Sequence, residues 1–265
     1  MMYPQEYYDA IAEFRLMDDT FMSAVFDRDT LSLNLLLNII LNRSDMETID
    51  VKTQVSYSNL IDRSIRLDVE AKDSSGKLYN IEVQNRSDEA NVRRARYHSS
   101  MIDTKLLKRG EDFSALVDSY VIFITEQDVL GRNLPLYEID RVVKQTGAAF
   151  GDGSHIIYVN ASIDSEDTPL SKLMHDFKCK DPSEMYYSQL ASRVETIKNT
   201  EGGRETMCEI MNKLSEKAAR EADRNRQIEV ALTMIKKGKL GFEEIAEYSG
   251  LTVEEVKALA EGKPA

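Results

Sequence analysis

The chain has 265 residues and a net charge of −12, which is enough length for one large domain or one domain with a small appendage. Its 42% hydrophobic content can build a sizeable core, and its two cysteines cannot form a disulfide framework or a zinc site alone. No apolar run reaches the roughly 18–20 residues that cross a bilayer, and the first ten residues lack a secretory-signal pattern, so we expect a cytoplasmic globular protein with no membrane partner.

The N-terminal part, residues 1–45, has a helical pattern. Thr30 is a predicted N-cap, because the leucines and isoleucines that follow it are spaced for one helical face. From residue 48 to residue 56 the hydrophobic period shifts towards two, which predicts a first strand. The chain therefore begins with helices and then enters a sheet.

The clearest local signal lies between residues 65 and 84. Apolar and polar residues alternate in IRLDVEA and again in LYNIEVQ, and DSSGK between them is a turn sequence in which Gly76 can take positive φ. If the apolar side chains share one face, the turn centres on Ser75 and Asp68 lies directly across from Glu82. We predict a β-hairpin in this register.

The remaining elements follow in a simple order. A helix is predicted over about 87–109, with Gly110 as its stop, and YVIFI at 120–124 is typical of a strand buried on both faces. HIIYV at 155–159 predicts another strand, and from about residue 183 the chain is helical. This order of helices and strands predicts an α/β domain with a mixed central sheet flanked by helices.

Three carboxylates share the polar face of the predicted hairpin. Asp68 faces Glu82, and Glu70 lies two residues along the same face. Like charges in cross-strand neighbours are destabilising, so a bound divalent cation would explain them, since Mg²⁺ and Mn²⁺ prefer oxygen ligands. The alternative is an ordinary solvated face of an antiparallel hairpin. The residues by themselves leave both interpretations open.

The segment RLDVEAKDSSGKLYNIEVQ resembles the metal-site hairpin of the PD-(D/E)XK nuclease superfamily, and more narrowly the Rpn-type recombination-promoting nuclease or putative transposase family. That family has an Asp, a turn with Gly, and then an Asn-Ile-Glu-x-Gln run, matched here by Asp68, Gly76 and residues 80–84. DDTFMSAVF, RRARYHSSMID and SYVIFITEQD extend the similarity over most of residues 15–200. The resemblance implies a restriction-endonuclease-like core.

The resemblance also implies a chemistry. Asp68 and Glu82 would hold Mg²⁺, with Mn²⁺ as a substitute and the Val83 backbone carbonyl as a third oxygen ligand. The last motif residue is usually Lys in the superfamily, but Gln84 occupies it here, as in Rpn-type members. A glutamine can orient water but carries no charge, so it cannot lower the pKa of the water as Lys would. Slow turnover is therefore compatible with this motif.

Further site residues are predicted around these three. Asp19 and Glu70 are candidates for an additional acid, although an Asp at the start of a helix also favours the helix by itself. Between residues 86 and 109 there are seven basic and three acidic residues, a local charge of +4 in an acidic protein. From this run we predict Arg93 and Arg96 as phosphate ligands. The three histidines are isolated in the sequence and are predicted to be structural.

The sequence predicts two domains, a nuclease-like domain over 1–200 and an all-helical C-terminal extension over 201–265. The extension ends in EEIAEYSGLTVEEVKAL, which resembles a helix-turn-helix. Its second helix carries Glu254, Glu255 and only one lysine, so we interpret the unit as a packing or oligomerisation module more than as a DNA reader.

The leading hypothesis is a Mg²⁺-dependent endodeoxyribonuclease that hydrolyses phosphodiester bonds in double-stranded DNA. The family resemblance implies a link with DNA recombination or mobile elements. The alternative is a catalytically weak or inactive nuclease fold that works as a DNA- or protein-binding module. Cleavage of both strands would favour a homodimer, which the helical tail could mediate.

Overall fold

A computed structural model of the chain describes residues 3–57, 65–86 and 90–262. The chain forms two compact units, residues 1–207 and residues 208–265. In the described part of the chain, no helix combines the length and the apolar character that a bilayer-spanning segment needs.

The first unit is built on a mixed sheet with the strand order β1-β2-β3-β4-β6-β5. The pairs β1–β2, β2–β3 and β5–β6 are antiparallel, and β3–β4 and β4–β6 are parallel. The strands are β1 (Thr48–Tyr57), β2 (Ile65–Asp73), β3 (Leu78–Gln84), β4 (Ser119–Thr125), β5 (Leu136–Ile139) and β6 (Ser154–Asn160). The predicted mixed sheet is confirmed.

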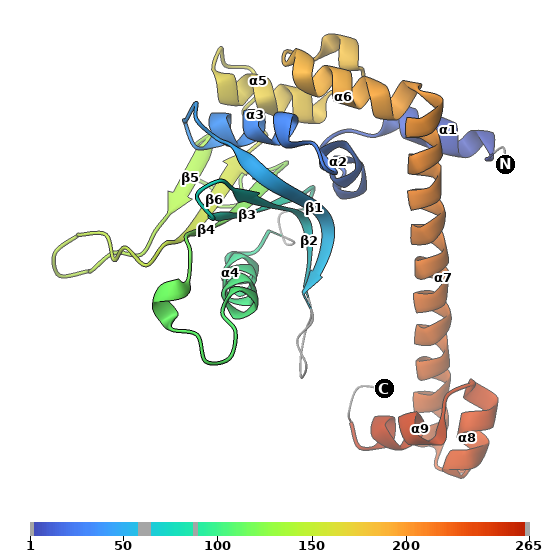
Figure 1. Cartoon of the computed structure of the whole chain (residues 1–265). Helices are drawn as coiled ribbons and strands as arrows, with labels where there is room; N and C mark the ends of the chain where they lie inside the picture. The colour runs from blue at the N-terminus through green and yellow to red at the C-terminus, as the bar shows by residue number, and fades with distance from the viewer. Residues whose placement is uncertain (1–2, 58–64, 87–89, 263–265) are drawn as a thin grey trace. The chain divides into compact units, whose positions relative to one another are not determined.

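Helices cover both faces of this sheet, as Figure 1 shows, with α4 on one face and α2, α3 and α5 on the other. Their apolar sides supply the two layers of the core, and α4 packs on β4 and β6 while α2 packs on β1, β2 and β3. The α-helices of this unit are α1 (Gln5–Glu13), α2 (Asp19–Phe26), α3 (Thr30–Ile40), α4 (Val92–Leu106), α5 (Pro169–Lys178) and α6 (Ser188–Asn199), and α7 (Glu201–Lys237) begins within it. Two short 3-10 turns, η1 (Phe113–Ala115) and η2 (Pro182–Glu184), complete the unit.

The β2–β3 hairpin has the predicted register, with Val69 opposite Ile81 and Glu70 opposite Asn80. Its turn is held by Asp73, whose carboxylate accepts hydrogen bonds from the N–H groups of residues 75 and 77, and Gly76 has φ of 91°. Every residue of β3 is buried, on both faces of the strand. The interpretation of the acidic face as a solvated surface is therefore wrong at Glu82.

Two local predictions are corrected, and one strand was missed. The N-cap of α3 is Asp29, whose carboxylate accepts from two backbone N–H groups, and Thr30 is the first helical residue. Helix α4 ends at Leu106, and Gly110 instead takes positive φ in the following turn. Strand β5 was not predicted, because its four residues are all at least partly exposed and carry no alternating pattern.

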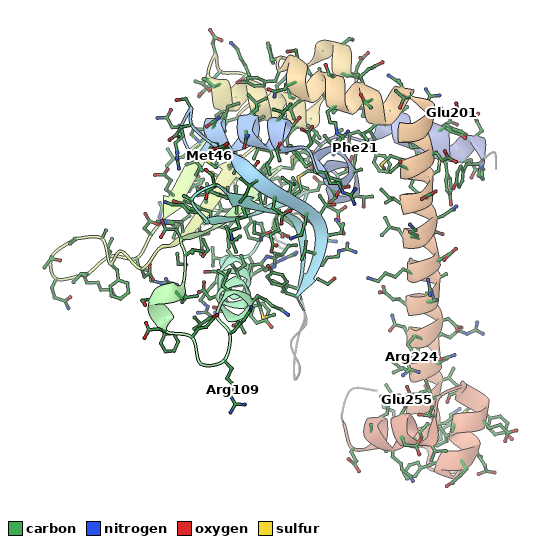
Figure 2. The ribbon with its side chains drawn as sticks, in the orientation of Figure 1. Phe21, Met46, Arg109, Glu201, Arg224 and Glu255 are labelled. Atoms are coloured by element: carbon green, nitrogen blue, oxygen red, sulfur yellow. The ribbon has the colours of Figure 1, made fainter. Side chains whose placement is uncertain are left out.

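The second unit contains the rest of α7 with α8 (Phe242–Ser249) and α9 (Val253–Ala260). Ala231 of α7 packs with Ile245, Ala246 and Val256, so the two short helices bury their apolar sides against their own long helix. Figure 2 shows Arg224 of α7 beside Glu255 of α9, and the two side chains form an ion pair. This packing is compatible with the predicted packing module.

Candidate active site

A cleft of about 1120 Å³ opens in the first unit at one end of the hairpin. Its walls come from the start of α2 and the residues before it, the first residues of β2, the end of β3 and the first two turns of α4. Asp68, Val83 and Gln84 all line it. The hairpin therefore delivers three of the predicted residues to one cavity.

Asp68 and Glu82 lie where the ladder between β2 and β3 stops. Val69 and Ile81 are the last paired residues towards the cleft. Beyond this pair, backbone N–H groups of the two strands donate to the carboxylates of Asp68 and Glu82 and not to backbone carbonyls. The Asp68 N–H donates to Glu82 Oε1 (3.3 Å), and the Val83 N–H donates to Asp68 Oδ2 (3.3 Å). The two acidic side chains thus occupy the gap between the strands.

The backbone at Asp68 is held from the other face of the sheet. Ser23 of α2 donates its hydroxyl to the Asp68 carbonyl (3.2 Å), and the Gln54 amide donates to that same hydroxyl oxygen (2.6 Å). Gln54 has φ of 55°, a left-handed conformation that is uncommon for a residue other than glycine. These contacts fix Asp68 while its carboxyl group faces the cleft.

Burial dominates the electrostatics of the pair. The side chains of Asp68 and Glu82 are 5% and 0% exposed. Loss of solvent raises the pKa of Asp68 to about 7, with a further contribution from the charge of Asp19, while the Arg94 and Arg66 guanidinium groups act in the opposite direction. Burial, followed by the charge of Asp68, raises the pKa of Glu82 well above its ordinary value.

These residues fit a divalent cation. Among the described residues, the buried side-chain polar atoms without a hydrogen-bond partner are Glu82 Oε2 and Asn80 Oδ1, both on β3. The Val83 carbonyl faces the gap, because the N–H and C=O of one strand residue point to the same side. Across residues 3–57, 65–86 and 90–262 no three Asp, Glu, His or Cys side chains converge on one point. Two carboxylates and a carbonyl are the oxygen donors that Mg²⁺ accepts alongside water.

The other predicted residues are distributed unevenly. Gln84 ends β3, is 7% exposed and lines the cleft. Asp19 also lines it and lies 3.9 Å from Arg66 Nη2. Glu70 accepts a hydrogen bond from Tyr57 and does not line the cleft, so the structure separates it from the acid pair.

The basic residues of α4 divide in the same way. Arg93 lines the cleft, whereas Arg96 is exposed and lies outside its walls. The sequence missed Arg94, whose Nη2 lies 3.6 Å from Glu82 Oε2. It also gave no place near the acids to His98, which was predicted to be structural and is buried with Nδ1 3.7 Å from Glu82 Oε1. The i, i+4 spacing of Arg94 and His98 was the available signal.

Comparison with known proteins identifies the family. Residues 27–168, more than half of the chain, match the model of the PD-(D/E)XK nuclease family transposase. The chain belongs to this family. No curated protein and no solved structure gives a significant match. The span that matches the PD-(D/E)XK family contains Asp68, Glu82 and Arg94 but not Asp19. The family match therefore includes the hairpin and α4 and does not include α2.

The raised pKa of Asp68 predicts how stability depends on pH without metal. Between about pH 4 and pH 7 the folded protein keeps a proton that the unfolded chain releases, so the free energy of unfolding falls as pH rises through this window. A pKa raised from 3.8 to about 7 corresponds to at most about 4 kcal/mol. Urea unfolding in EDTA at pH 5 and pH 8 measures the loss.

The matched variants make this test specific. The Asp68→Asn variant should lose less stability over the same pH interval, because its side chain cannot ionise, whereas Glu70→Gln should behave like the wild type. An equal loss in the wild type and in Asp68→Asn would contradict the prediction and assign the pH dependence to other groups.

Proposed function

We propose that this protein is a divalent-metal-dependent endonuclease that hydrolyses phosphodiester bonds in double-stranded DNA. The observation that carries the proposal is the buried Asp68–Glu82 pair in the gap at the end of the hairpin, with Glu82 Oε2 lacking a hydrogen-bond partner. Two adjacent buried acids, each with a raised pKa, form a costly arrangement, which a divalent cation would relieve.

The two acids, the Val83 carbonyl, Gln84 and Arg93 each have a role in this proposal. Asp68, Glu82 and the Val83 carbonyl would hold Mg²⁺ or Mn²⁺, and the ion would supply charge stabilisation at the scissile phosphate and a more acidic water. Gln84 orients the attacking water by hydrogen bonding through its amide. Arg93 binds a phosphate of the DNA backbone at the wall formed by α4.

The local charge supports DNA as the substrate. Four arginines, at positions 66, 86, 93 and 94, line the same cleft as Asp68, in a protein whose overall charge is −12. Local positive potential beside a cation site suits a polyanion whose backbone must approach the metal. The proposal has three further parts. The protein acts in DNA recombination, and it forms a homodimer that cuts both strands. Residues 1–200 form the nuclease domain, and residues 201–265 form a helical extension.

Incubation of supercoiled plasmid with the full-length protein in Mg²⁺, Mn²⁺, Ca²⁺ or EDTA tests the activity. We expect nicked or linear products in Mg²⁺ or Mn²⁺ and none in EDTA. The second candidate function is a DNA-binding module with a weakened catalytic site, which the uncharged Gln84 favours. A gel-shift assay in EDTA, run alongside the cleavage assay, distinguishes this binding module from the nuclease. DNA binding without cleavage in any metal would contradict the nuclease and support the binding module.

A further inference from the structure

Arg94 connects the buried acid to the open cleft. Its Nη2 atom lies 3.6 Å from Glu82 Oε2, beyond hydrogen-bond distance, and that oxygen is the one without a hydrogen-bond partner. The side chain of Arg94 is 37% exposed and lines the cleft, whereas that of Glu82 is fully buried. The guanidinium therefore faces the acid on one side and the substrate's space on the other.

His98 orients this guanidinium. The Arg94 Nε–H donates to His98 Nε2 (3.4 Å), one helical turn further along α4. The ring of His98 is 2% exposed and packs 5.8 Å from the ring of Phe123 on the neighbouring strand. Because the ring is fixed by this packing, it holds Arg94 Nε in place, with Nη2 on the side of Glu82.

A guanidinium and a divalent cation compete for the same carboxylate. Arginine keeps its charge at every accessible pH, so it cannot be neutralised by losing a proton when a metal ion arrives. A cation bound at Glu82 Oε2 would be repelled by Arg94 at its present distance, and the repulsion is strong because Glu82 is shielded from water. The outward side of Arg94 offers the alternative of a phosphate oxygen.

We propose that Arg94 is an exchange residue, which neutralises Glu82 in the metal-free protein and moves to a phosphate oxygen of the substrate when a divalent cation occupies the acid pair. The proposal rests on the proposed function for its substrate. It also explains how a site with Gln84 in place of lysine obtains a fixed positive charge, which α4 supplies instead of β3. Loading of metal and binding of phosphate are then coupled through one side chain.

The exchange has two consequences of opposite sign. Removal of the Arg94 charge eliminates a competitor for Glu82, so the affinity for a divalent cation should rise. The same change removes a phosphate ligand, so DNA binding and cleavage should weaken. A residue with a purely structural role would lower both, because loosening the site damages metal and substrate binding together.

Mn²⁺ binding to the full-length protein without DNA, measured by electron paramagnetic resonance, is the deciding experiment. We expect Arg94→Gln to bind Mn²⁺ roughly 3- to 10-fold more tightly than the wild type, a change of up to about 1.4 kcal/mol. Arg94→Lys, which keeps the charge, should stay closer to the wild type. Arg93→Gln, the neighbouring cleft arginine, should leave Mn²⁺ affinity within about twofold while weakening DNA binding.

The outcomes separate this inference from the proposed nuclease. Unchanged or weaker Mn²⁺ binding by Arg94→Gln, with circular dichroism equal to that of the wild type, overturns the exchange whether or not plasmid is cut. If Arg94→Gln does not fold, the Mn²⁺ affinities of Arg94→Lys and Arg93→Gln are compared instead. Tighter Mn²⁺ binding by Arg93→Gln alone overturns the assignment to Arg94. A third outcome is that Glu82→Gln abolishes Mn²⁺ binding and Arg94→Gln strengthens it, while the protein cleaves no DNA. This outcome supports the exchange and contradicts the nuclease.

Discussion

Asp68→Asn and Glu82→Gln are expected to lower Mg²⁺-dependent plasmid cleavage by about 100-fold or more and, at the same time, to stabilise the metal-free fold at pH 8. The loss of activity follows because a metal ligand contributes several kilocalories per mole of transition-state stabilisation. The gain in stability follows because each amide replaces one member of a buried pair whose charges repel.

The combined measurement is plasmid cleavage in Mg²⁺ and urea unfolding in EDTA, both at pH 8. Glu70→Gln is the matched control, since Glu70 lies on β2 beside Asp68 but outside the cleft and bonds to Tyr57. Its cleavage rate should stay near that of the wild type. Loss of cleavage in all three variants, or retained cleavage in Asp68→Asn, would remove the acid pair from the mechanism.

Gly203→Ala is expected to destabilise the first unit by about 1–3 kcal/mol or more, whereas the adjacent Gly202→Ala should be neutral or slightly stabilising. A Cβ atom at Gly203 would lie 2.6 Å from the Ile197 Cα and still closer to the Thr196 carbonyl oxygen. Both contacts are backbone atoms of α6, so no side-chain rotation can relieve them. A Cβ atom at Gly202 has no heavy atom within 4 Å among the atoms considered.

Thermal unfolding of the two variants beside the wild type measures this difference. The pair controls for helix propensity, because the same substitution is made at consecutive positions in the first turn of α7. Equal melting temperatures for Gly202→Ala and Gly203→Ala would mean that the close approach of α6 and α7 is not required for stability.

The hairpin was predictable because its information is local. Alternation in two short segments and one turn sequence determine the register, and the register alone places Asp68 opposite Glu82. What the pattern could not show was burial, because alternation predicts two different faces and not what covers the polar one. The start of α2 and the side of α4 cover it, and these contacts come from elsewhere in the chain.

The rotation of α4 about its axis was the second unpredictable feature. A run of basic residues shows that a helix is cationic but not which of its arginines faces the sheet. Packing on β4 and β6 decides this, and it turns Arg94 and His98 towards Glu82 while Arg96 faces solvent. Strand β5 escaped prediction for the same reason, since its place at the sheet edge depends on pairing with β6 and not on its own pattern.

The acid pair and its basic neighbours all come from one stretch of the chain, from Arg66 on β2 to His98 on α4. Contacts at such small sequence separation cost little loop-closure entropy and have low contact order. The parallel pairing of β3, β4 and β6 instead joins strands separated by long crossovers. The contact between the two acids is therefore local in the chain, whereas the sheet that buries them depends on contacts of longer range.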